Sequence, residues 1–328
     1  MLISIALCTY NGERYLQEQL DSILTQTILP DEVIICDDQS SDDTWSILES
    51  FKEQAEFKVE LIKNKLNLGS TKNFEKAISL CSGEIVFLAD QDDVWLPCKL
   101  QLMTDVFEKN REVGMVFSDA WVTDAYLQAY PLSLWQYIGF DERIQSILRQ
   151  GRLSSKLIID CYVTGATMAF RKELFPLLVP FPEMWVHDEW ITYVTDLVSR
   201  VEFIPQQLIK YRKHEDQQIG IKVNGRQGRS SYVRWRLSIF PDGHRRRCKR
   251  RIEKMEMVLG RILGFRKYLR DPQVYDELVD RLEHWKARYN LPRKPWKRWK
   301  SIQNELHLGR YHKYSGSNRM AFKDLVEK

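Results

Sequence analysis

The sequence predicts an α/β protein, with a mostly parallel sheet and flanking helices, followed by a mainly helical extension. Two observations support this prediction. Strand-type and helix-type segments alternate through the first 90 residues, which is typical of a parallel sheet covered by helices. After about Gly220 the pattern changes to long, basic segments whose apolar residues recur at helical spacing. We therefore expect two domains, residues 1–220 and residues 221–328.

The beginning of the chain supplies four expected strands and three expected helices. Short apolar runs predict the strands, and apolar side chains at helical spacing predict the helices. The strands are expected at 2–7, 32–36, 57–62 and 84–89. The helices are expected at 13–24, 44–51 and 71–80. The last of these strands is apolar throughout, so we expect both of its faces to be buried.

The rest of the chain is less regular until the basic region begins. Further strands are expected at 113–117, 163–170 and 207–211. The clearest helices of the basic region are expected at 245–268 and 274–289.

The net charge of +4 conceals an uneven distribution of charge. Residues 1–220 carry 20 Lys and Arg against 34 Asp and Glu, whereas residues 221–328 carry 29 against 11. Such an asymmetry suggests that the second part faces an anionic partner.

Polar clusters follow three expected strands, at 9–13, 37–43 and 90–93. Ligands of parallel sheets collect at the carboxyl ends of the strands, so these clusters should line one edge. Asp90 and Asp92 lie two residues apart and should point to the same side of an extended chain. Two such carboxylates suit Mg²⁺ or Mn²⁺, which also accept phosphate oxygens. The alternative is a solvated acidic turn, and the position after a buried strand favours the metal.

The other two clusters indicate a nucleotide ligand. Asp38 ends a strand, where its carboxylate can accept the imide N–H of uracil or thymine. Loops before the first and third helices add further candidates for donor binding: Thr9, Tyr10, Glu13, Asn67, Gly69, Lys72 and Asn73. Taken singly, each of these is also a common cap or turn residue.

In order and together, these motifs resemble family 2 glycosyltransferases, which have the Rossmann-like GT-A fold. The resemblance covers about two thirds of the chain. It rests on the segments 9–13, 37–40, 67–69, 73–74, 90–95, 164–168, 187–190 and 211–214. The Asp-Gln-Asp-Asp-Val-Trp and His-Asp-Glu-Trp variants resemble bacterial rhamnosyltransferase-like members. Those members build O-antigen, capsule or other surface polysaccharides.

The resemblance implies an inverting transfer of a sugar, with rhamnose as one candidate, from a UDP- or dTDP-sugar to a growing, lipid-linked glycan. It implies that Asp38 contacts the base and that Asp90 lies near the ribose and the metal. Asp92 would be the main ligand of a Mn²⁺ or Mg²⁺ ion, which His214 can also approach. Asp188 would be the catalytic base, removing a proton from the attacking hydroxyl group.

The acceptor side of the site is expected around Asp188. Apolar neighbours would raise the pKa of Asp188, although this residue also suits the N-cap of a helix starting near Glu189. The glycine in the turn at 164–167 lets the backbone approach a sugar, unless it serves only tight packing. The acceptor-side candidates are Gly165, Ala166, Thr167, His187, Glu189 and Trp190.

Residues 221–328 match no motif with a mechanism of its own. Basic residues are interspersed with aromatic ones there, which suits an anionic membrane surface or a lipid phosphate. The aromatic residues are Trp235, Phe240, Trp285, Trp296 and Trp299. A self-packing helical extension is the alternative, and no nucleic-acid-binding fold is visible.

The sequence also predicts where the protein works. The N-terminus lacks the pattern of a signal peptide, and no segment has the roughly 20 apolar residues that span a bilayer. None of the six cysteines forms a C-x-x-C pair. We expect a cytoplasmic protein, peripheral on the inner face of the membrane.

Two rival functions are a nucleotidyltransferase, which would need a basic loop in place of residues 8–13, and a non-catalytic glycan- or membrane-binding protein.

Overall fold

The computed structural model describes residues 1–151, 161–215, 217, 244–292 and 294–326. The chain forms two compact units, Met1–Trp235 and Arg236–Lys328. The domain boundary expected at residue 220 lies outside the described residues.

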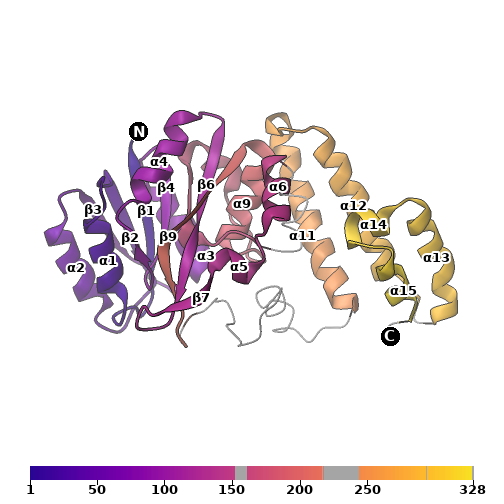
Figure 1. Cartoon of the computed structure of the whole chain (residues 1–328), viewed down its shortest axis with the longest axis horizontal. Coiled ribbons are helices and arrows are strands. Elements are labelled where there is room, and N and C mark those ends of the chain that lie inside the picture. The colour runs from indigo at the N-terminus through magenta and orange to yellow at the C-terminus, as the bar shows by residue number, and fades with distance from the viewer. Residues whose placement is uncertain (152–160, 216, 218–243, 293, 327–328) are drawn as a thin grey trace. The chain divides into compact units, whose positions relative to one another are not determined.

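The first unit is a nine-stranded sheet flanked by helices, as predicted (Figure 1). Its strands are β1 (Ile3–Thr9), β2 (Glu32–Asp37), β3 (Lys58–Lys63), β4 (Ile85–Asp90), β5 (Val94–Trp95), β6 (Val113–Thr123), β7 (Ala129–Ser133), β8 (Met168–Arg171) and β9 (Arg200–Arg212). Its helices are α1 (Leu16–Leu24), α2 (Thr44–Gln54), α3 (Ser70–Leu80), α4 (Lys99–Lys109), α5 (Leu134–Ile138), α6 (Glu142–Arg149), α8 (Phe175–Leu178) and α9 (His187–Val198).

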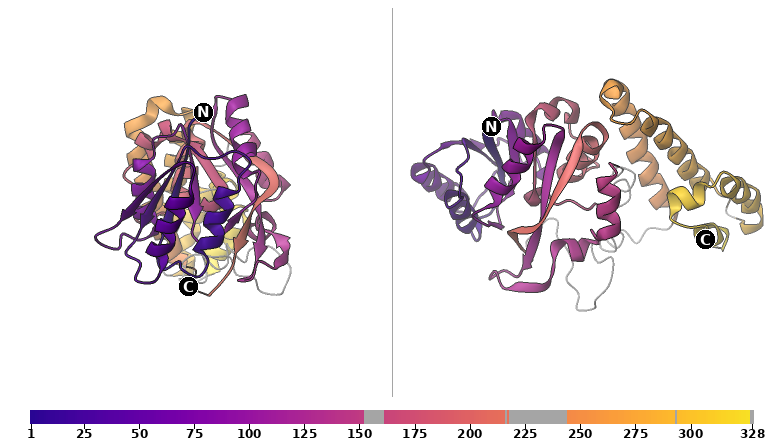
Figure 2. Two further views of the ribbon diagram at one scale, coloured as in Figure 1. Left: turned by 90° about the vertical axis from the view of Figure 1, so that its left-hand side faces the viewer. Right: turned by 45° about the horizontal axis from the view of Figure 1, so that its top comes forward.

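The strand order is β3-β2-β1-β4-β8-β6-β9-β5, and β7 pairs with β6. The first four strands of this order are parallel. Beyond them the sheet is mixed, because β8 runs antiparallel to β4 and β6 while β9 runs parallel to β6. The strands fan out with the usual twist (Figure 2). Since β2 and β4 flank β1 on opposite sides, the strand order reverses beside β1, which is where ligands of such sheets bind.

The apolar runs form the centre of this sheet. In β4 the residues from Ile85 to Ala89 are fully buried, which confirms that both faces of the strand are covered. Right-handed crossovers place α3 on the opposite face from α1 and α2. Helix α3 packs there against α9, while α4 covers β6 and β9 in front of the sheet (Figure 1).

Three strands depart clearly from the predicted bounds. β6 continues to Thr123 and β9 begins at Arg200, because these strands pair with each other along most of their length. The expected strand at 163–170 is shorter, since Gly165–Thr167 forms a 3-10 turn and the strand begins at Met168.

The second unit is helical, as expected. It contains α11 (His244–Phe265), a 3-10 turn (Arg266–Tyr268), α12 (Gln273–Tyr289), α13 (Pro295–His307), α14 (Arg310–Ser315) and α15 (Arg319–Val326). α11 packs along α12, and the last three helices enclose the buried residues Ile302, Tyr311 and Ala321. Among the described residues, no helix of either unit combines the length and apolar character needed to cross a membrane.

Candidate active site

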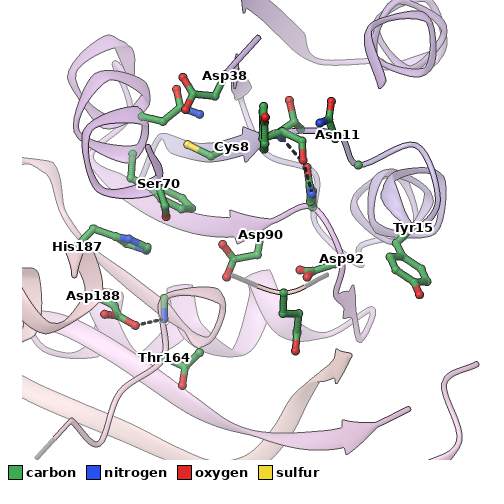
Figure 3. A pocket seen from close by; sticks show the side chains of 18 of the residues that line it. Cys8, Asn11, Tyr15, Asp38, Ser70, Asp90, Asp92, Thr164, His187 and Asp188 are labelled. Atoms are coloured by element: carbon green, nitrogen blue, oxygen red, sulfur yellow. Dashed lines mark hydrogen bonds between the residues drawn. The ribbon is translucent and has the colours of Figure 1, made fainter. Parts of the chain in front are cut away.

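A cavity of about 480 Å³ opens at the carboxyl ends of β1, β2 and β4. The predicted convergence of the three polar clusters is therefore found, since each contributes to the wall. The predicted site residues that line the cavity are Thr9, Tyr10, Asp38, Asn73, Asp90, Asp92, Gly165, His187, Asp188 and His214. Figure 3 shows Asp90 in the middle of this pocket, with Asp92 and Asp188 on either side.

Other predicted site residues do not line the cavity: Glu13, Asn67, Gly69, Lys72, Ala166, Thr167, Glu189 and Trp190. Several of them support the fold instead. The Glu13 carboxylate accepts the N–H of Asp43 at 3.0 Å, and the Lys72 ammonium pairs with Glu75 at 2.7 Å. Trp190 is fully buried and donates its indole N–H to the carbonyl oxygen of Leu178 at 2.7 Å.

Asp38 holds the loop that precedes α3. Its Oδ1 accepts the Leu68 N–H and its Oδ2 accepts the Gly69 N–H, each at 2.8 Å. The Asn64 side-chain amide donates to Oδ1 at the same distance. Gly69 has φ of 75°, a left-handed conformation that glycine adopts without strain. Asn67 and Gly69 therefore act behind the pocket, by shaping the loop around Asp38.

Gln91 fixes the loop that follows β1. Its Oε1 accepts the Tyr10 N–H at 2.8 Å, and its Nε2 donates to the Tyr10 carbonyl oxygen at 3.0 Å. A side chain at Gly12 would collide with the Gln91 amide, which explains the glycine at this position. The second residue of the acidic motif thus holds the loop after β1 in place.

The acidic residues of the motif differ in their surroundings. Burial raises the pKa of Asp90 to about 8, and the charges of Asp92 and Asp188 add to this rise. Burial also raises the pKa of Asp93, with the charges of Asp92 and Asp90 adding to the effect. Asp93 does not line the cavity, and its Oδ1 accepts the backbone N–H of Arg212 at 3.0 Å. Asp93 therefore anchors β9, while Asp90 and Asp92 face the pocket.

Two buried basic side chains support this acidic segment from behind. The Lys99 side chain donates to the Ala166 carbonyl oxygen at 2.6 Å. Burial lowers the pKa of Lys99 well below its ordinary value, although the charges of Asp93 and Asp90 oppose this shift. The Arg212 guanidinium donates to the carbonyl oxygens of Asp92 at 2.8 Å and Ala125 at 2.7 Å. Arg212 also pairs with Glu18 and lies over the Tyr15 ring.

The predicted metal ligands lie close to one another. The Oδ2 of Asp92 is 2.9 Å from the Nε2 of His214, and both residues line the cavity beside Asp90. Within the described ranges, no group of three His, Cys, Asp or Glu side chains is arranged to hold a metal by itself. Mg²⁺ is commonly held by one or two carboxylates together with substrate phosphates. The crowded carboxylates therefore fit an ion that shares its coordination with a bound diphosphate.

Asp188 lies in the first turn of α9. The helix begins at His187 with Val186 as N-cap residue, so the interpretation of Asp188 as an N-cap was wrong. Its Oδ2 accepts the Gly165 N–H at 3.2 Å and its Oδ1 accepts the Glu189 N–H at 2.6 Å. These bonds orient the carboxylate, which is 8% exposed and lines the cavity.

Sequence reasoning assigned no site role to several residues of the cavity wall: Cys8, Arg14, Tyr15, Ser70, Tyr211 and Gln217. Cys8 directly follows the strand expected at 2–7, and Tyr15 lies in the helix expected at 13–24. Small or amphipathic side chains are as common in cores as in pockets. Their positions next to the recognised polar clusters are the signal that could have found them.

Comparison with known proteins connects this geometry to a family. The model of the family described as "Glycosyl transferase family 2" matches residues 4–176. An uncharacterized glycosyltransferase of Nostoc sp. is 29% identical over 224 residues, which are 65% of each chain. The Escherichia coli protein "UDP-Glc:alpha-D-GlcNAc-diphosphoundecaprenol beta-1,3-glucosyltransferase WfgD" is 31% identical over 200 residues, covering 60% of this chain and 70% of that protein.

The chain spans about one third to two thirds of the length of the Nostoc protein and three further curated relatives. The fold is also shared with a solved structure. Staphylococcus aureus TarS 1–349, crystallised with UDP-GlcNAc, has a TM-score of 0.56 and 16% sequence identity, covering 92% of this chain and 81% of that chain. This similarity places the chain among proteins with the predicted GT-A fold.

Proposed function

The chain belongs to glycosyl transferase family 2, and we propose that its cavity transfers a sugar from a UDP- or dTDP-sugar to a hydroxyl group of an acceptor, with inversion at the anomeric carbon. One observation carries this proposal. Asp38, the pair Asp90 and Asp92, and Asp188 all line one cavity at the switch point of the sheet. This arrangement favours catalysis over a purely binding protein, and family membership favours transfer of a sugar over transfer of a nucleotide.

Asp188 acts as the base. Its carboxylate removes the proton from the acceptor hydroxyl as the oxygen bonds to the anomeric carbon, and the bond to the diphosphate breaks in the same step. The N–H groups of Gly165 and Glu189 fix the orientation of this carboxylate. Proximity and alignment of this kind supply much of the rate enhancement in a displacement reaction.

The donor binds across the carboxyl ends of β1, β2 and β4. In this proposal Asp38 accepts an imide N–H of the base, and Asp90 lies in the middle of the pocket beside Asp92 (Figure 3). Asp90, Asp92 and His214 would hold a Mn²⁺ or Mg²⁺ ion, which when bound stabilises the charge on the departing diphosphate. The motif resemblance favours rhamnose as the sugar, whereas the name of the Escherichia coli relative specifies glucose.

The acceptor in this proposal is a growing, lipid-linked surface glycan of the O-antigen or capsule type. The name of the Escherichia coli relative, which specifies a diphosphoundecaprenol acceptor, supports this class. A lipid-linked acceptor requires the enzyme to work at a membrane surface. We place this work on the cytoplasmic face.

Helices α13 and α15 are the proposed membrane contact. The two acidic residues between 294 and 326, Glu305 and Asp324, are both buried and paired, with Arg310 and Arg288 respectively. The exposed surface of this segment is therefore free of carboxylates. Its exposed aromatic and basic residues include Trp296 (72% exposed), Trp299 (50%), Phe322 (69%), Lys297, Lys300 and Arg319. Exposed aromatics among cations suit the interface of an anionic bilayer.

The structure corrects one member of the aromatic set predicted for this contact. Trp285 is 1% exposed and belongs to the core of the helical unit. Trp235 and Phe240 lie outside the described residues.

A donor screen tests the proposed reaction. Thermal shift with UDP-glucose, UDP-N-acetylglucosamine, UDP-galactose and dTDP-rhamnose, each with Mn²⁺, should identify a donor that raises the melting temperature by mass action. Incubating that donor with membrane lipid extract should move its sugar into the lipid fraction. Failure of every donor to stabilise the protein would contradict the proposal.

A further inference from the structure

His187 is a buried polar side chain of the cavity wall that the proposed reaction does not use. The residue is 5% exposed, and it lines the cavity. Neither of its ring nitrogens has a hydrogen-bond partner among the residues that the structure describes. A buried polar group left without a partner costs free energy, so such groups usually mark a ligand, a water molecule or a functional strain.

The His187 ring is held in one orientation by its neighbours. One of its faces stacks on Phe74 of α3, with 4.0 Å between the ring centroids and 24° between the planes. A side chain at Gly165 would lie only 2.7 Å from the His187 Nε2, so this glycine leaves room for the ring. Figure 3 shows the ring extending from α9 toward the interior of the pocket. The side chain is therefore held in one orientation in the cavity wall, with both ring nitrogens buried there and without a partner among the described residues.

The chemistry of the ring selects the kind of group it binds. Burial lowers the pKa of His187 to about 3, so the imidazole is neutral at physiological pH. A neutral imidazole offers one N–H donor and one nitrogen acceptor. A sugar hydroxyl group, which both donates and accepts, matches this pair. A phosphate oxygen only accepts hydrogen bonds, so it would leave the acceptor nitrogen of the ring without a partner.

We propose that His187 hydrogen-bonds a hydroxyl group of the donor's sugar and thereby helps to select that sugar. This inference rests on the proposed function. The ring adjoins Asp188, the proposed base, and Phe74 of α3, whose N-terminal loop is tied to Asp38. A sugar that extends from a nucleotide held at Asp38 toward Asp188 passes this ring. His187 is therefore a specificity-determining residue of the donor side, whereas the resemblance of its motif had suggested the acceptor side.

Calorimetric titration of the full chain in the presence of Mn²⁺ tests the proposal. UDP, dTDP, UDP-glucose, UDP-N-acetylglucosamine, UDP-galactose and dTDP-rhamnose are titrated into the wild type and two variants, H187F and H187Q. Phenylalanine preserves the stacking on Phe74 and removes both polar atoms, while glutamine keeps a donor and an acceptor. We expect the wild type to bind one nucleotide-sugar more tightly than it binds the corresponding nucleoside diphosphate. H187F should bind that nucleotide-sugar about three- to tenfold more weakly than the wild type does, while its affinity for the diphosphate alone stays the same.

The relative affinities of the two variants for the nucleotide-sugar distinguish a hydrogen bond from a packing role. A hydrogen bond to the sugar predicts that H187Q retains more of the sugar's contribution than H187F, and a packing role predicts the reverse order. The proposal is overturned if H187F keeps the full contribution, or if the wild type binds a diphosphate but gains nothing from any sugar. A wild type that binds neither UDP nor dTDP would instead refute the proposed function on which the inference rests.

Discussion

The side-chain nitrogen of Lys99 lies 2.6 Å from the carbonyl oxygen of Ala166, which joins the start of α4 to the turn beside Asp188. Lys99 is fully buried, and its nitrogen lies 3.5 Å from the centre of the Trp95 ring. Burial lowers the pKa of Lys99, and the charges of Asp93 and Asp90 oppose this shift. One side chain thus supports both the proposed metal site and the turn that orients the proposed base.

Replacing Lys99 by methionine should damage stability and activity together. The variant leaves the buried Ala166 carbonyl oxygen without the Lys99 donor, and an unsatisfied buried polar group typically costs about 1–3 kcal/mol. Urea denaturation and a transfer assay measure the two effects. K109M is the matched control, because Lys109 lies on the same helix with its side chain 78% exposed. Wild-type stability of K99M would contradict the supporting role.

Replacing Asp188 by asparagine should abolish turnover while sparing the donor site. Asparagine has nearly the same shape but cannot take up the acceptor proton, so kcat should fall by about 10²–10⁴-fold. Affinity for UDP should change little. Steady-state kinetics and calorimetry check these outcomes, with E183Q as the control at an exposed acidic residue shortly before α9. An undiminished kcat in D188N would exclude Asp188 as the base.

Removing the metal should weaken nucleotide binding through Asp92. We expect EDTA to reduce the affinity of the wild type for UDP at least about tenfold, because the diphosphate loses its bridging cation. The D92N variant should bind UDP weakly with or without Mn²⁺. Calorimetric titrations in both conditions provide the measurement, and D105N on the surface of α4 is the control. If D92N responded to Mn²⁺ as the wild type does, the ligand assignment would be wrong.

Acid should destabilise the first unit partly through His187. The pKa of this residue is about 3 in the folded protein, against an ordinary value of 6.5 for an exposed histidine, so the unfolded chain binds the extra proton between these values. Its stabilising contribution is complete above pH 6.5 and is lost as the pH falls toward 3, by about 1.4 kcal/mol per pH unit at most. H187F, which has no proton to bind, should lose less stability between pH 7 and pH 5 than the wild type. Urea denaturation at both pH values measures the free energy of unfolding. An equal loss of this free energy in the two proteins would contradict the prediction.

The exposed aromatic residues of α13 should govern membrane binding. We expect the W296S/W299S variant to bind phosphatidylglycerol-containing vesicles several-fold more weakly than the wild type, because it loses two interfacial anchors. K297Q/K300Q should weaken binding chiefly at low salt, since each surface cation contributes about 1 kcal/mol. Co-sedimentation measures both. Y268S, at a half-exposed tyrosine of the same unit, is the control. Equal binding of all four proteins would refute the proposed contact.

The sequence predicted those elements and site residues that depend on local sequence patterns. Apolar runs and helical spacing located the first four strands and their helices, because these segments pair or pack with near neighbours in the chain. The acidic motif and Asp38 were found because strand ends and polar side chains coincide there.

The supporting residues that the sequence did not reveal act through partners far away in the chain. Lys99 acts through a carbonyl oxygen at Ala166, and Arg212 acts through carbonyl oxygens at Asp92 and Ala125. Every residue has a backbone carbonyl group, so a sequence motif cannot indicate which carbonyl oxygen accepts such a hydrogen bond. Lys72 was named as a candidate for donor binding, and its partner in the structure is Glu75, one helical turn away.

The position of β9 has a consequence for synthesis of the protein. This strand pairs with β5 and β6, which are made about 80 to 120 residues earlier, and it delivers Tyr211 and His214 to the pocket. A nascent chain that has not yet released residues 200–214 from the ribosome therefore lacks one wall of the cavity. Under the proposed function, the donor site is complete only when synthesis of the first unit is nearly finished.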